Sequence, residues 1–369
     1  MANKPEIIAF YLPQYHPFKE NDEWWGKGFT EWTNVGKAKP LFKGHNQPRV
    51  PTELGYYDLR LSIVREQQAQ MAREAGVTAF CYWHYWFGNG KRLIPEVFQE
   101  VLESGNPDFP FCLGWANHSW FAKNWNADGT TTQKLLMEQT YPGIEDEKMH
   151  FKFLLKAFKD NRYVKIDGKP LLYIFAPLDL PREYVENFRQ WTKDVGFPDL
   201  YLVANIRDER KPKEEFLAMG YDAVTYQRLG EPSIPGSSLS AKLKRFVYKW
   251  SKKIKGTILH RPPFMTDYRE IYHNLVNEGD YAEDVIPALL PQWDHTPRSG
   301  WNGTLIAHAE PKYFYMHCKE ALAAVRQKKN PILFLKSWNE WGEGNMMEPD
   351  MTYGRGFIEA LRKAINEES

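Results

Sequence analysis

The chain has 369 residues, of which 43% are apolar, and it is therefore long enough to bury a large core. Its 48 basic and 47 acidic side chains leave a formal net charge of +1, which gives no general attraction to nucleic acid or to an anionic membrane. No window of about 18 residues is wholly apolar, and the first residues lack the apolar stretch of a signal peptide, so we expect a cytoplasmic protein without a membrane-spanning helix.

Short apolar runs recur along the chain, each bounded by Pro, Gly or Asp and followed by a segment with helical spacing. Such runs are typical of buried parallel strands. Eight strand–helix pairs are the number in a TIM barrel, so we predict one α/β domain over residues 1–369, a single (β/α)8 barrel with long, aromatic-rich loops after its strands. A doubly wound sheet is the alternative. The strands are expected at 7–12, 78–86, 109–117, 171–176, 200–206, 223–227, 285–293 and 332–338, and the helices at 58–75, 93–104, 147–159, 181–195, 212–219, 266–278, 310–328 and 354–367.

The carboxyl ends of the predicted strands are rich in polar and aromatic residues. In a TIM barrel these ends share the face on which binding and catalytic residues lie. Aromatic rings offer a sugar an apolar face, so the pattern predicts a sugar-binding cleft, although packing under long loops could explain some of them. The candidate substrate-binding residues near strand ends are Tyr11, Tyr15, His16, His84, Trp86, Trp115, Asn117, Gln227, Trp293, Asp294, Trp338, Asn339 and Glu348, and those in the loops 17–57 and 118–146 are Trp25, Glu31, Trp32 and Trp120.

Residues 331–349 form the most informative stretch of the sequence. An apolar strand ends there in WNEWGEG (338–344), which places two carboxylates three residues apart among Trp and Gly. Paired carboxylates perform acid–base work on glycosidic bonds, and burial beside Trp raises the pKa of a carboxyl group. We therefore predict that Glu340 and Glu343 are the catalytic pair. Asp294 and Glu31 are further candidates, and a solvated turn is the alternative.

The sequence indicates neither a catalytic metal nor a nucleotide cofactor. It has no HExxH motif, no tight Asp/His cluster, no GxGxxG after a strand and no P-loop. We therefore expect His16, His84 and His118 to hydrogen-bond to sugar hydroxyl groups rather than to hold a metal. The absence of a DxD triplet weakly disfavours a metal-dependent nucleotide-sugar transferase.

Segment 229–263 is expected to be a basic amphipathic insertion within the barrel. Residues 232–262 hold eight Lys or Arg and no acidic residue, and apolar residues recur at helical spacing from Leu239 to Ile254. Such a helix is typical of an interfacial membrane binder or of a site for an acidic partner. We favour a helix packed on the barrel with a solvated basic face. The alternative is a peripheral membrane contact through 239–255, which would suit an enzyme acting on lipid-linked glycans.

Longer motifs resemble the WbsX-type family of polysaccharide-biosynthesis proteins over nearly the whole chain. The family's name implies a glycosyltransferase of surface polysaccharide or O-antigen. The motifs are AFYLPQYHP (9–17), NDEWWGKGFTEWTNV (21–35), FCYWHYWF (80–87), DFPFCLGWANHSW (108–120), DGKPLLYIF (167–175), PQWDHTPRSGWNGT (291–304) and SWNEWGEGNMMEP (337–349).

The same residues also resemble glycoside hydrolase family 99, the endo-α-mannosidases and endo-α-mannanases on a TIM barrel. That family ends its last strand in a Phe-Asn-Glu-Trp-His-Glu-Gly pattern followed by Ile-Glu, which WNEWGEG (338–344) and Met347-Glu348 match here. Gly342 replaces the family's His, so the mannose specificity is not carried over.

The second resemblance also implies roles for individual residues. It implies that Glu340 is a base that assists the substrate's own 2-hydroxyl group, by a route through an anhydro-sugar. Glu343 would then be the general acid and afterwards the base toward water. The resemblance further implies active-site positions for Tyr15 and for the loop that contains Asn302.

Three functions fit these observations. The first is a retaining glycoside hydrolase or transglycosylase, without cofactors, that acts on an α-linked bacterial polysaccharide. The second is a glycosyltransferase of surface polysaccharide, for which the basic segment is the best support. The third is a non-catalytic glycan-binding barrel, in which both glutamates could be replaced without loss of binding.

Overall fold

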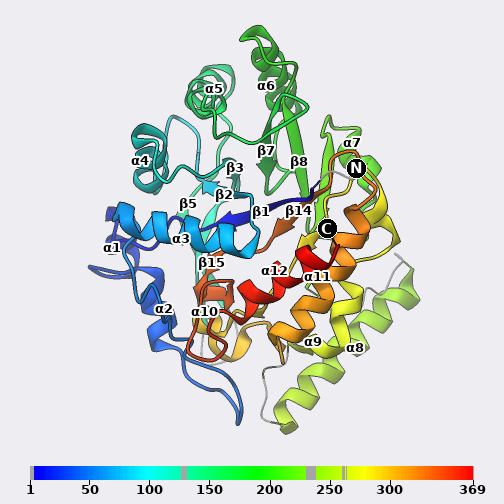
Figure 1. Ribbon diagram of the computed structural model, residues 1–369. Helices are drawn as coiled ribbons and strands as arrows, with labels where there is room; N and C mark the ends of the chain where they lie inside the picture. The colour runs from blue at the N-terminus through cyan, green and yellow to red at the C-terminus, as the bar shows by residue number, and fades with distance from the viewer. Residues whose placement is uncertain (1–3, 126–130, 230–237, 260–261, 263, 369) are drawn as a thin grey trace.

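The centre of the molecule is a parallel sheet that nearly closes into the predicted TIM barrel. The computed structural model describes residues 4–368 except 126–130, 230–237, 260–261 and 263. The strand order is β11, β14, β1, β2, β3, β7, β8, β9, and a parallel bridge between Val224 and Val285 brings the two edges together (Figure 1). The strands are β1 Glu6–Tyr11, β2 Ala79–His84, β3 Phe111–Trp115, β7 Lys169–Ile174, β8 Tyr201–Ile206, β9 Ala223–Tyr226, β11 Ala288–Leu289 and β14 Ile332–Leu335.

Aromatic side chains account for much of the barrel interior. Phe10 lies at the centre, with its ring centroid 4.9 Å from that of Trp83, 4.8 Å from Tyr173 and 5.1 Å from Phe334. These four residues come from β1, β2, β7 and β14, so one aromatic layer ties strands across the barrel. Part of the high aromatic content therefore serves packing, as the alternative to the lined cleft suggested.

Helices cover the outside of the barrel where the sequence predicted them, to within a few residues. In α3, Val64, Ala69 and Met71 bury one face, and Gly76 ends the helix with a φ of 89°, which favours glycine. Helices α3, α12 and α11 lie beside one another on one flank of the barrel (Figure 1). The outer helices are α3 Ser62–Ala75, α4 Glu96–Ser104, α5 Ile144–Phe158, α6 Arg182–Asp194, α7 Lys213–Leu217, α11 Pro311–Val325 and α12 Gly356–Glu368.

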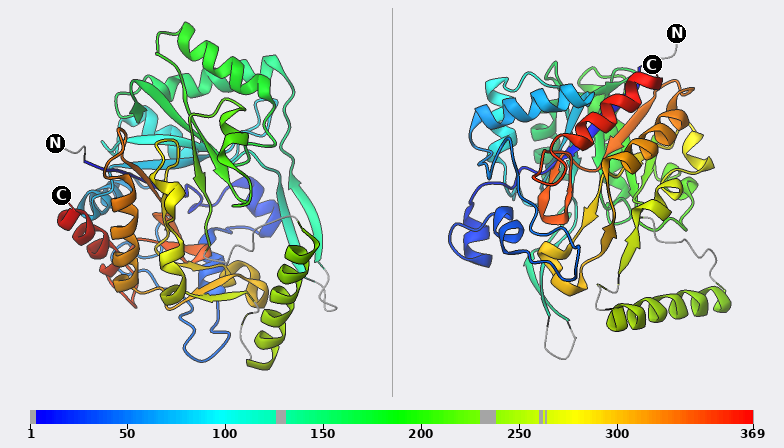
Figure 2. Two further views of the ribbon diagram at one scale, coloured as in Figure 1. Left: turned by 90° about the vertical axis from the view of Figure 1, so that its right-hand side faces the viewer. Right: turned by 60° about the horizontal axis from the view of Figure 1, so that its bottom comes forward.

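The long loops contain structure of their own. The loop after β1 forms α1 Lys19–Trp25 and α2 Glu31–Lys37, and the loop after β3 forms the hairpin of β4 Trp120–Trp125 and β5 Thr131–Met137. Helix α10 (Thr296–Ser299) lies with α1 and α2 at the end of the barrel toward which the strands run (Figure 2).

The predicted seventh strand, 285–293, is mostly irregular. Pairing in the barrel is regular only at β11, because Pro287 and Pro291 interrupt the run and donate no hydrogen bond. Trp293–Asp294 forms β12 in a separate sheet with β13 Leu305–Ala307 and β10 Met265–Asp267. The helix expected at 266–278 is reduced to α9 Tyr268–Ile271 and the 3-10 turn η1 Tyr272–Asn274.

Helix α8 (Leu239–Leu259) is the amphipathic helix expected within 229–263, part of which lies outside the described residues. The packing on the barrel that we favoured is wrong, because its apolar side chains are exposed. Figure 2 shows α8 standing away from the barrel wall. Its exposed apolar residues are Leu239, Leu243, Phe246, Val247, Trp250, Ile254 and Ile258. No helix in the described part of the chain is long and apolar enough to cross a membrane.

Candidate active site

The two predicted catalytic glutamates lie on a tight turn beyond the carboxyl end of β14. Strand β15 (Asn339–Glu340) pairs with β16 (Asn345–Met346), and the 3-10 turn η4 (Trp341–Glu343) joins them. The side chain of Asn339 fixes the turn to the end of β1, since its Oδ1 accepts from Leu12 N at 2.7 Å and its Nδ2 donates to Leu12 O at 3.0 Å. Asn339 therefore anchors the turn to Leu12, whereas the sequence had suggested that it binds sugar.

Arg298 of α10 joins both glutamates and a third carboxylate. Its Nη1 donates to Glu343 Oε1 at 2.6 Å and its Nη2 to Glu340 Oε1 at 2.6 Å, and Nη2 lies 3.0 Å from Glu31 Oε2. One planar guanidinium can contact three carboxylates only where they converge on a small space. In the described part of the chain, no cluster of His, Cys, Asp or Glu is arranged to hold a metal ion, and Arg298 supplies the positive charge here.

Glycine at position 342 makes room for this cluster. A Cβ atom there would lie 2.4 Å from Glu31 Oε2 and 2.9 Å from Arg298 Nε, which no side chain could accept without displacing them. Gly342, which departs from the family 99 pattern, thus leaves open the space that Glu31 and Arg298 occupy.

Burial gives Glu340 an unusual pKa. Desolvation and the charges of Glu343 and Glu31 raise it, Arg298 lowers it, and the balance leaves the pKa of Glu340 at about 8. The Glu340 side chain is 10% exposed and that of Glu343 is 22% exposed, so Glu343 is the more open to solvent. Burial lowers the pKa of neighbouring Lys336 to about 8, against the opposing effect of the two glutamates. Two groups in the site therefore titrate close to neutral pH.

Glu348 supports the turn from behind. Its carboxylate accepts from Trp341 Nε1 at 2.6 Å, Gln68 Nε2 at 2.6 Å and Tyr57 Oη at 2.8 Å. Burial raises its pKa to about 7, and these donors lower it. Tyr11 contributes indirectly, because its hydroxyl donates to Gln68 Oε1 at 2.6 Å. Glu348 thereby fixes the ring of Trp341, and neither it nor Tyr11 bonds to the catalytic pair.

An aromatic group flanks the carboxylates. Tyr15 is buried, its hydroxyl accepts from Trp341 N at 2.9 Å, and its ring centroid lies 4.6 Å from that of Trp32. Burial and the charges of Glu340 and Glu31 raise the pKa of Tyr15 well above its ordinary value. The structure therefore brings Tyr15, Trp32 and Glu31 to the carboxylate pair, as the sequence suggested.

Asp294 is fully occupied by structural hydrogen bonds. It accepts from His45 Nε2 at 2.9 Å, Gln47 Nε2 at 2.6 Å and Thr296 Oγ1 at 2.6 Å. Burial raises its pKa, but these bonds outweigh burial and hold it below the ordinary value. Asp294 also meets Gly344, where a Cβ would lie 2.8 Å from Asp294 Cβ and the backbone φ is 53°. We therefore withdraw Asp294 as a catalytic candidate and as a sugar contact, because it anchors loops.

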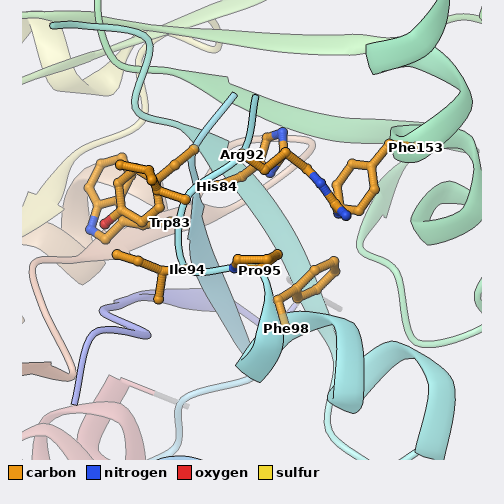
Figure 3. A pocket seen from close by; sticks show the side chains of 9 residues that line it. Trp83, His84, Arg92, Ile94, Pro95, Phe98 and Phe153 are labelled. Atoms are coloured by element: carbon orange, nitrogen blue, oxygen red, sulfur yellow. The ribbon is translucent and has the colours of Figure 1, made fainter. Parts of the chain in front are cut away.

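His84 lines a small pocket together with Arg92 and Phe153. Figure 3 shows it beside Arg92 and Phe153, with the guanidinium 4.7 Å from the centre of the Phe153 ring. His84 Nε2 lies 2.8 Å from His150 Nε2, and burial with the nearby Arg92 lowers the pKa of His84 to about 3. His84 Nε2 is thus committed to His150, and the structure gives no support to the sugar contact that we predicted for this atom.

Several other predicted contacts are packing residues. Trp115 and Trp338 are 0% exposed and offer no face on which a sugar could stack. Trp86 Nε1 donates to Asp146 at 3.0 Å, and Asn117 bridges to both the N–H and the carbonyl of Ala176. Sequence could not separate these residues from binding residues, because strand ends carry both.

Among the described residues, no hydrogen bond or ion pair joins the remaining predicted residues to Glu31, Glu340 or Glu343. Trp25 and Asn302 are exposed on α1 and η3 (Gly300–Asn302), and Trp120 packs edge-on against Tyr85. Three others each present one buried polar atom without a partner among the described residues, which a ligand could satisfy. These atoms are His16 Nε2, Gln227 Oε1 and Trp293 Nε1.

Our sequence reasoning missed Arg298 and Lys336. Arg298 lies within the motif PQWDHTPRSGWNGT (291–304), which carries part of the family resemblance, but we assigned no role to its positive charge. Lys336 lies four residues before Glu340. A search of the nearby sequence for a cation that balances the carboxylates would have identified it.

Fold and site together define a (β/α)8 barrel with a carboxylate-lined site at the end of its last strand. The Glycosyltransferase WbsX family matches residues 7–361, and the chain belongs to that family. Over 368 residues it is 32% identical to the uncharacterized protein WxcX of Xanthomonas campestris pv. campestris, a match that covers 97% of this chain and 49% of the relative. The chain thus spans about half the length of the curated relatives it matches.

Solved structures with a similar fold are glycoside hydrolases or resemble them. The GH99 endo-alpha-mannosidase of Bacteroides thetaiotaomicron matches with a TM-score of 0.56 and 14% identity, over 100% of this chain and 98% of that one. A glycoside hydrolase-like protein matches with a TM-score of 0.57 and 17% identity, over 99% and 95%. At these identities the likeness shows the TIM-barrel fold, which confirms the predicted fold class.

Proposed function

We propose that this protein is a retaining glycoside hydrolase that cleaves an α-linked bacterial polysaccharide, with Glu340 and Glu343 as its catalytic pair. The observation that carries the proposal is the contact of one guanidinium, that of Arg298, with both carboxylates at 2.6 Å. Such convergence at the end of a barrel strand is the arrangement that glycosidic bond cleavage needs.

In the proposed mechanism Glu340 acts as base. It takes the proton of the substrate's 2-hydroxyl group, whose oxygen attacks the anomeric carbon as the glycosidic bond breaks. Glu343 gives its proton to the departing oxygen. In the second half Glu343 takes a proton from water, the water oxygen attacks the anomeric carbon of the anhydro-sugar, and O2 recovers its proton from Glu340. Inversion occurs twice, so configuration is retained.

The electrostatics of the site support this division of roles. A carboxylate with a pKa of about 8 is a stronger base, once ionised, than an ordinary one, which suits removal of a hydroxyl proton. Arg298 keeps part of the Glu340 population ionised. Glu343, being more open to solvent, can exchange its proton with a leaving oxygen and with incoming water.

A glycosyltransferase is the second candidate, favoured by the family name and by the basic helix α8. In that function the anomeric carbon would be transferred to an acceptor sugar rather than to water. A non-catalytic glycan-binding barrel is the third, in which glycan would bind without turnover and both glutamates could be replaced without loss of binding.

The test is product analysis on α-linked oligosaccharides and on surface glycan, for wild type, Glu340→Gln and Glu343→Gln. Glu6→Gln is the matched control, because Glu6 lies at the opposite end of β1 and its pKa is also raised by burial. We expect cleavage with wild type and Glu6→Gln, and at least a hundredfold loss in both site variants. Sugar transfer without cleavage would establish the transferase, and glycan binding without turnover would establish the binding barrel.

A further inference from the structure

Helix α8 exposes an apolar face that no other part of the described structure covers. Its side chains at Phe246 and Trp250 are 59% and 52% exposed, and Leu239, at its start, is 84% exposed. The helix has 21 residues and is therefore about 30 Å long. Large apolar side chains gathered on one surface in this way mark an interaction site rather than scattered surface residues.

The sequence of α8 places charge opposite to this face. At 100° per residue, the seven exposed apolar positions named above fall within an arc of roughly 120°, and the basic positions fall on the remaining arc. The helix carries seven Lys or Arg and no acidic residue. The rest of the chain, with 41 basic and 47 acidic side chains, is net acidic. Attraction to an anionic surface is therefore confined to α8.

We propose that α8 docks the protein on an anionic lipid bilayer, with its apolar face in the boundary between headgroups and acyl chains. A basic face with Phe, Trp and Leu on the other side is the pattern of interfacial helices. A second copy of α8 fits less well, because its seven positive charges complement an anionic surface and not another helix of the same charge.

Docking through α8 would place the candidate active site near the lipid. The helix follows β9 at the carboxyl end of the barrel strands, the same end at which β14 leads into Glu340 and Glu343. This extension rests on the proposed function. If that function holds, the substrate class is a glycan that is carried on a lipid and presented at the bilayer surface.

The experiment measures co-sedimentation of the full chain with vesicles of phosphatidylcholine alone or with phosphatidylglycerol added. The test variant is Phe246→Ser/Trp250→Ser/Ile254→Ser. The matched control is Leu61→Ser/Ile63→Ser/Val195→Ser, which removes three exposed apolar side chains elsewhere. We expect binding to the anionic vesicles, at least tenfold weaker binding by the test variant, unchanged binding by the control, and weakening by added salt.

The outcomes separate docking from catalysis. Glu340→Gln/Glu343→Gln should bind vesicles like wild type, so docking can succeed where the proposed function fails. Absence of binding, equal binding to both vesicles, or undiminished binding by the test variant would overturn the proposal. A dimer in solution that the test variant abolishes, without vesicle binding, would assign the face to a second copy instead.

Discussion

Replacing Arg298 by Met should destabilise the protein, and more at pH 8 than at pH 5. The guanidinium contacts Glu340 and Glu343 at 2.6 Å and Glu31 at 3.0 Å, and all of these side chains are at most 23% exposed. Arg298 lowers the pKa of Glu340, so without it that pKa, already raised by burial, rises further in the folded state. A raised folded pKa gives stability that is fully present below the unfolded pKa, near 4.3, and is lost as pH rises through the folded pKa.

The magnitude follows from the cost of protonating or burying these groups. At pH 5, holding one carboxyl protonated costs only about 1 kcal/mol, because the pH is close to the unfolded pKa. At pH 8 the cost approaches that of an uncompensated buried charge, about 3–4 kcal/mol. We expect losses of about these sizes in the free energy of unfolding, measured by urea denaturation with tryptophan fluorescence at both pH values.

Arg355→Met is the matched control for this experiment. Arg355 also bridges two carboxylates, Glu53 at 2.6 Å and Glu74 at 2.5 Å, but it is 37% exposed. Solvent screening should limit its loss to less than about 1 kcal/mol. A loss for Arg298→Met that is no larger than the control, or equal at pH 5 and pH 8, would refute the account of the carboxylate cluster.

Three further predictions concern the same site. On an aryl α-glycoside, whose leaving group needs no proton from Glu343, log kcat/KM for wild-type cleavage should rise as pH increases through about 8, because Glu340 must lose its proton to act as base; a fall over that range would make Glu340 the acid. Gly342→Ala should reduce cleavage at least tenfold with a loss of about 1–3 kcal/mol in unfolding free energy, since its Cβ would lie 2.4 Å from Glu31; unchanged turnover would contradict the crowding. Asp294→Asn should lower the unfolding free energy by about 2–3 kcal/mol at pH 7, and by less as pH falls through the depressed pKa of the folded state, where the wild-type carboxylate also becomes protonated; an equal loss at pH 7 and at that acidic pH would contradict the depressed pKa.

The sequence by itself determined the barrel and the place of the turn that carries Glu340 and Glu343. Buried parallel strands are continuous apolar runs, so their number and order could be predicted without knowing their neighbours. Because all strands of such a barrel point the same way, the position of Glu340 and Glu343 after the last run fixed the end of the molecule on which they lie. Local spacing likewise determined the two faces of α8.

Only the tertiary structure decided which partners these residues have. Arg298 and Glu31 meet Glu340 although 267 positions separate them from each other, because closure of the barrel brings the loops after β1 and β11 together. Trp115 and Trp338 were predicted to contact sugar like Trp32, yet they are fully buried in the interior. Contacts between distant segments decide the direction of a side chain and the charge that faces it. They also decide whether the apolar face of α8 is buried or exposed, and no local pattern encodes such contacts.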